Sequence, residues 1–240
     1  MSNARATRST NILRMKYLVF AFIAVMMAYV IYHWEYFLID WSAPVWQHYR
    51  QLGVFLLVHG LAGATALILV PMQFFDGLRA RYTKLHRVVG RIYVTAALVL
   101  APFGVYVQWL DERLGIFPRS FTIATVIDAA LSMTTTGIGF VFALKRMIPQ
   151  HREWMTRSYA VALIFFEGRV IVAVMGWDQD PVNLETVVWS CIAFAVLIGD
   201  IANQIYELQS MRPRAVRAPV AQAVAAESIG GVATPCLFAT

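Results

Sequence analysis

The sequence contains little charge and few cysteines. Aspartate, glutamate, lysine and arginine make up 14% of its 240 residues, whereas about 25% is usual in soluble domains. The two cysteines, Cys191 and Cys236, lie far apart and fit neither a disulfide framework nor a zinc-ligand spacing. The chain also lacks a phosphate-binding loop, a dinucleotide fingerprint and a two-histidine zinc helix. The sequence therefore has none of the motifs that would indicate a kinase or a hydrolase.

Hydrophobic residues are abundant instead, at 59% of the chain, and the mean hydropathy is +0.60. A helix of about 20 apolar residues crosses the hydrocarbon core of a bilayer, and six windows reach that length. The sequence therefore predicts an all-α fold, a six-transmembrane helix bundle embedded in a lipid bilayer. The predicted spans are 17–39, 52–75, 91–110, 121–144, 157–177 and 185–205.

The two ends of the chain are predicted to lie outside this transmembrane domain of residues 17–206. Residues 1–16 form a basic arm, and residues 207–240 form a weakly ordered tail rich in alanine and valine. The first apolar run is longer than the hydrophobic region of a signal peptide, and no small-residue cleavage site follows it. A retained first helix is therefore expected.

The net charge is +6, and the basic residues are distributed unevenly. Of the 20 lysines and arginines, 16 fall on one side of the predicted spans. They occupy the N-terminal arm, the turns 76–91 and 145–157, and the tail. Cytoplasmic loops carry such an excess. We therefore expect a plasma (inner) membrane protein with both termini in the cytoplasm, and no role for the charge in nucleic-acid binding.

Two basic turns carry the same pattern. His86 and Arg87 begin the first, and His151 and Arg152 begin the second, each between two apolar stretches. Spans two and three flank the first turn, and spans four and five flank the second. This predicts an internal repeat of two helical hairpins, with both imidazoles at similar depth near the cytoplasmic surface.

Several separated motifs carry a resemblance to a known family. They are His59-Gly60, Gly63, Pro71, Gln73-Phe74, Leu85-His86-Arg87, Gly90-Arg91, Tyr93, and the run from His151 to Ala160 apart from Thr156. In this order they resemble a family of uncharacterised bacterial membrane proteins, domain of unknown function 2306, which implies a membrane fold and no particular activity. The segment at His86 is also similar to a heme-ligating segment of heme A synthases, and six-helix cytochromes b561 are a looser analogy.

The paired histidines have two interpretations. Two imidazoles on facing helices are the ligands of a b-type heme, so heme b held by iron bonds to His86 and His151 is one hypothesis. In that hypothesis Arg87, Arg91, Arg152 and Arg157 pair with the heme propionates. In the other interpretation, the histidines and arginines lie at the membrane interface and contact lipid phosphates without any cofactor.

A second set of polar residues lies within the spans, towards the opposite face. His59, Asp128, Glu167 and Arg169 are expected at similar depth on three helices. Each charged group there costs about 2.5–3.5 kcal/mol, so the charges should be paired or should line a wet cavity. We expect Arg169 to pair with Asp128. The set forms either a shared polar site for a proton or quinol, or a structural ion pair that fixes the packing of the helices.

Three functions are compatible with these features. The first is a b-type cytochrome-like redox protein that passes electrons between a quinol or external donor and a cytoplasmic partner. The second is a non-enzymatic subunit, or a lipid- or quinone-binding bundle, of a larger membrane complex. The third is a transporter, which is disfavoured because no pair of corresponding helices is broken by glycine or proline.

Overall fold

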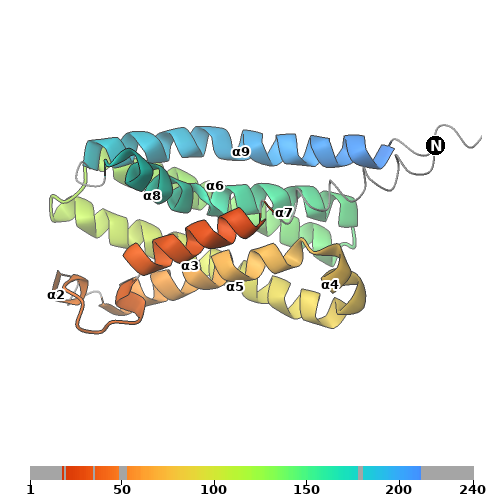
Figure 1. Cartoon of the computed structure of the whole chain (residues 1–240), viewed down its shortest axis with the longest axis horizontal. Helices are drawn as coiled ribbons and strands as arrows, with labels where there is room; N and C mark the ends of the chain where they lie inside the picture. Colours follow the sequence, from red (N-terminus) through yellow and green to blue (C-terminus); the bar gives the residue numbers. More distant parts are fainter. Residues whose placement is uncertain (1–17, 19, 35, 49–52, 178–180, 212–240) are drawn as a thin grey trace, which may run out of the picture. The chain divides into compact units, whose positions relative to one another are not determined.

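The computed structural model describes residues 18, 20–34, 36–48, 53–177 and 181–211, and all regular structure in these ranges is helical. The helices are shown in Figure 1. They are η1 (Tyr36–Leu38), α2 (Val45–His48), α3 (Gly53–Gln73), α4 (Asp76–Arg81), α5 (Thr83–Arg113), α6 (Arg119–Leu144), α7 (Ile148–Ala162), α8 (Ile164–Met175) and α9 (Pro181–Met211), preceded by a helix over Phe20–His33. The predicted all-α class is confirmed for the described residues.

Five of the described helical segments are long and apolar enough to cross a membrane. They are Gly53–Gln73, Thr83–Arg113, Arg119–Leu144, Ile148–Met175 and Val182–Leu208. Each coincides with one of the predicted spans two to six. The helix at Phe20–His33 lies inside the predicted first span but is shorter than the other five. The predicted arm 1–16 and the tail beyond Met211 lie outside the described residues.

Two helices begin earlier than the predicted spans. α5 begins at Thr83 instead of residue 91, and α7 begins at Ile148 instead of residue 157, about two turns earlier in each case. Hydropathy marks where a helix leaves the hydrocarbon, whereas helical hydrogen bonding continues into the polar interface. His86 and His151 therefore lie in the first turns of long helices and not in the loops before them.

The fifth span is divided at Leu163. The amide of Leu163 bonds to the carbonyls of both Tyr159 and Ala160, which tightens the last turn of α7 before α8 begins. α8 ends at Gly176, whose φ of 68° is the left-handed conformation that favours glycine at a helix end. The amide of Trp177 then bonds to the carbonyl of Val172.

The chain forms two compact units that divide at Asp200, within α9. In the first unit α3 packs along α5, α5 along α6, and α6 along α7 (Figure 1). The cluster of buried residues around Tyr93, Val94, Ala97 and Tyr159 joins α3, α5, α7 and the Phe20–His33 helix, and a second cluster joins α6 to α8 and α9. The described part of the second unit continues α9 from Ile201 to Met211.

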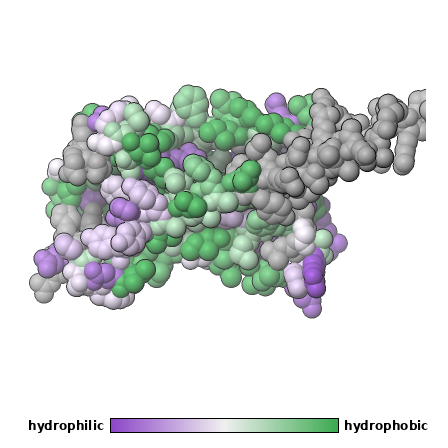
Figure 2. All heavy atoms as spheres, in the orientation of Figure 1, coloured by the Kyte–Doolittle hydropathy of each residue, from purple (hydrophilic) through white to green (hydrophobic). Residues whose placement is uncertain are grey.

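The outer surface of the helices is strongly apolar. On the face in Figure 2, hydrophobic residues cover most of the visible helices. Val54, Leu61, Phe194 and Leu197 each expose about half of their side-chain surface or more. Soluble monomers do not expose apolar area on this scale, and lipid is the solvent that such a surface requires.

Candidate functional site

The two predicted histidines lie at the same end of the bundle. His86 is in the first turn of α5 and His151 in the first turn of α7, and both are half-buried. The charges of His151, Arg79 and Arg87 all act on the imidazole of His86. The two sequence motifs therefore lie at the same end of the bundle, within electrostatic reach of each other.

The ring of His151 is held by a neighbouring helix. Its Nδ1 atom lies 2.8 Å from the carbonyl oxygen of Gly139 in α6. A carbonyl only accepts hydrogen bonds, so Nδ1 carries the proton and Nε2 has a free lone pair in the neutral ring. This arrangement fixes both the tautomer and the ring orientation, as it does for metal-bound histidines in proteins.

Gly139 permits this contact because α6 and α7 approach closely there. A Cβ atom on Gly139 would lie 2.8 Å from Sδ of Met155 and 3.4 Å from Cβ of Trp154. A larger residue at this position would require the side chain of Met155 to move. The absence of a side chain at Gly139 thus allows α7 to pack closely against α6 near His151.

Ser158 links the two motifs directly through hydrogen bonds. Its hydroxyl lies 2.7 Å from that of Tyr93 in α5 and 2.6 Å from that of Thr136 in α6. All three side chains are buried, with at most 1% of their surface exposed. Ser158 belongs to the second basic motif of the sequence, but nothing in that motif indicated these two hydrogen bonds.

The four arginines predicted to face a heme lie in different surroundings. Arg157 pairs with Asp200 of α9, with Nε and Oδ1 2.5 Å apart, and its guanidinium lies over the ring of Trp154. Arg152 is half-buried, whereas Arg87 and Arg91 are exposed on the first turns of α5. Asp200 had no assigned role in the sequence, so the carboxylate partner of Arg157 is new information from the structure.

His59, the first member of the predicted polar layer, is turned towards α5. Its Nδ1 atom lies 3.4 Å from the carbonyl oxygen of Leu100, and its Cε1 atom occupies the space beside Gly104 where a Cβ atom would be only 2.8 Å away. The imidazole of His59 thus contacts a backbone carbonyl of the neighbouring helix α5.

The other three members have separate neighbours. Oδ1 of Asp128 is buried and has no hydrogen-bond partner among the described residues, so the expected pair with Arg169 is not formed through that atom. The guanidinium of Arg169 lies 6.0 Å from the ring centre of Trp34. Glu167 lies close enough to Tyr159 and Cys191 for its charge to act on both.

Comparison with known proteins places this site within a family. A family model described as "Predicted membrane protein (DUF2306)" matches residues 56–202. That range contains His59, His86, His151 and Asp200, together with every described contact of Ser158. No curated protein and no solved structure matches the chain.

Proposed function

Since the chain belongs to the DUF2306 family of predicted membrane proteins, we propose that it is a multi-pass membrane protein that holds a b-type heme between α5 and α7. His86 and His151 are the axial ligands in this proposal. Heme supplies one-electron chemistry, and the protein passes electrons between a quinol or external donor and a cytoplasmic partner.

The observation that carries the proposal is the fixed ring of His151. The bond from its Nδ1 to Gly139 leaves Nε2 as the only nitrogen with a free lone pair, and Nε2 is the atom that a heme iron would take. A histidine that served only to contact lipid at the interface would not need this orientation. His86, in the first turn of α5, supplies the second imidazole in this proposal.

The surrounding cations suit the carboxylates of a heme. Arg79 and Arg87 lie near His86, and ion pairs between guanidinium groups and carboxylates are strong and directional. Arg157 contributes differently from the sequence-based hypothesis, because its Nε is taken by Asp200. Its role in the proposal is to hold α9 against α7 beside the site.

The proposed topology has six spans, including the helix at Phe20–His33, and two hairpins that repeat as α3–α5 and α6–α7. The excess of lysine and arginine supports an orientation with both termini and both histidines on the cytoplasmic side of the plasma membrane. An enzyme that is active only outside the cytoplasm can be fused to the C-terminus as a reporter. We expect this fused enzyme to stay inactive. Activity of that reporter would reverse the orientation.

Heme content tests the proposal. The protein is purified in mild detergent from heme-replete cells, and heme is extracted and compared with protein concentration. We expect close to one heme per chain, with an absorption spectrum that contains a Soret band. A colourless protein with the same helical content would exclude the redox function and leave a bundle without this cofactor.

A further inference from the structure

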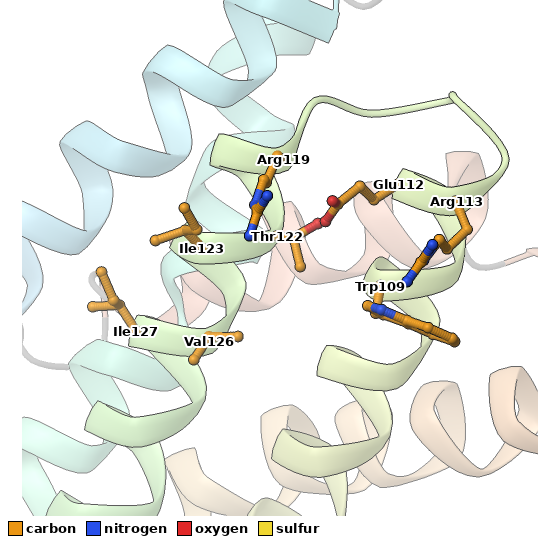
Figure 3. Close-up of a pocket in the computed structure, with 8 residues that line it drawn as sticks. All are labelled: Trp109, Glu112, Arg113, Arg119, Thr122, Ile123, Val126 and Ile127. Carbon is orange, nitrogen blue, oxygen red and sulfur yellow. The ribbon is translucent and has the colours of Figure 1, made fainter.

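A groove lies between the end of α5 and the start of α6, far along α5 from His86. Its volume is about 580 Å³. The lining residues, shown in Figure 3, are Trp109, Glu112, Arg113, Arg119, Thr122, Ile123, Val126 and Ile127. None of them belongs to the candidate heme site or to the polar layer of the sequence analysis.

One wall of the groove is polar and carries an excess of positive charge. Arg113 and Arg119 supply two guanidinium groups, whereas Glu112 supplies a single carboxylate. Figure 3 shows the Glu112 side chain directed from α5 towards the start of α6. An anionic group bound here would balance the charge.

Thr122 provides an independent sign of a missing ligand. Its side chain lines the groove and is 9% exposed, and its Oγ1 atom is buried with no hydrogen-bond partner among the described residues. Leaving such a hydroxyl without a partner costs about 1–3 kcal/mol. An acceptor or donor supplied by a bound molecule would remove that cost.

The start of α6 adds to the attraction for an anion. No side chain caps this helix at Pro118, and its first turn contains no acidic residue. Arg119 therefore adds its charge to the positive end of the helix dipole, which is unfavourable unless a negative group lies nearby.

The opposite wall of the groove is apolar and open to the surroundings. Ile123, Val126 and Ile127 expose 37–48% of their surfaces, and they follow one another down α6 towards the middle of the span. Trp109 lines the groove from α5, and the guanidinium of Arg113 lies 5.2 Å from the centre of its ring. Tryptophan and arginine at the end of a span are typical of the membrane interface.

We propose that this groove binds one membrane phospholipid. Arg113 and Arg119 hold the phosphodiester, with a hydrogen bond from the hydroxyl of Thr122. One acyl chain lies along Ile123, Val126 and Ile127, and Glu112 accepts a hydrogen bond from the amine or hydroxyl of the headgroup. A soluble anion would leave the apolar wall uncovered, and a lipid without phosphate would offer no anion to Arg113 and Arg119.

Native mass spectrometry of the delipidated full-length protein tests the proposal by adding back single compounds. Phosphatidylethanolamine is expected to bind at one site with at least tenfold higher affinity than a diacylglycerol of the same chains. Inorganic phosphate in large excess should not displace it. Equal binding of diacylglycerol, or displacement by phosphate, would overturn the proposal.

Variants locate the binding. Arg113→Gln/Arg119→Gln should weaken phosphatidylethanolamine binding at least tenfold, whereas Lys145→Gln/Arg146→Gln removes the same charge at the other end of α6 and should leave it unchanged. Thr122→Val preserves the shape of the side chain and should weaken binding several-fold. If both groove variants bind like the parent protein, the groove is not the lipid site. Heme content is expected to stay the same throughout, so this result is independent of the redox proposal.

Discussion

Replacing His151 with alanine is expected to abolish heme binding. The substitution removes a proposed iron ligand, the imidazole whose Nδ1 atom is bound to the carbonyl of Gly139. Changing a residue that merely orients a metal ligand lowers affinity by about 10–100-fold, so loss of the ligand itself should exceed that. The ratio of heme to protein after purification should fall at least about tenfold, and the same loss is expected for His86→Ala.

The matched control is His33→Ala. His33 is an exposed histidine whose ring contacts among the described residues are with Tyr29 and Tyr32, so its replacement should leave the heme ratio unchanged. Size-exclusion behaviour and helical content show whether the variants remain folded. A folded His151→Ala protein with a full complement of heme would contradict the assignment of this residue as a ligand.

The second large effect is expected for Gly199→Val, on stability. Gly199 is where α9 contacts α7, and a Cβ atom there would lie 3.1 Å from Cα and 3.3 Å from Cγ of Arg157. The closest atom belongs to the backbone of α7 and cannot rotate away, so α9 must shift. Overpacking of this kind costs about 1–3 kcal/mol, and the shift would also disturb the adjacent Arg157–Asp200 pair. Thermal unfolding in detergent should show a clearly lower midpoint.

Gly137→Val is the control for this prediction. Gly137 lies within α6, and a Cβ atom at that position would meet nothing within 4 Å. The same substitution should therefore change the unfolding midpoint little. If both variants unfold at the temperature of the parent protein, the close approach of α9 to α7 at Gly199 is wrong.

The sequence was sufficient to locate the long apolar helices, because helices that cross a membrane consist mostly of hydrophobic residues. It was not sufficient to place the ends of these helices. The apolar run of α5 begins near residue 91, but the helix begins at Thr83, since polar residues such as Lys84 and Arg87 are good helix formers. The sequence correctly predicted that His86 and His151 lie near the beginning of helices. The structure shows that they lie within the first helical turns and not in the loops before them.

Contacts between helices were harder to predict from the sequence. The depth of a residue in the membrane can be estimated from its position along a helix, but the neighbouring helix that its side chain faces cannot. Asp128 and Arg169 were expected at one depth and therefore as a pair, yet Oδ1 of Asp128 has no partner among the described residues. Gly137 and Gly139 are only two residues apart in α6, but of the two only Gly139 closely approaches a neighbouring helix. Ser158 is a common residue whose importance appears only when Tyr93 and Thr136 are seen beside it.

The most direct test of the paired-imidazole site is the absorption spectrum of the reduced protein before and after addition of carbon monoxide. Two histidines on the iron leave no open position, so a six-coordinate low-spin spectrum that carbon monoxide leaves unchanged is predicted. A spectrum that shifts on addition of carbon monoxide would show that one imidazole is absent from the iron. A protein without any heme absorption would contradict the site as a whole.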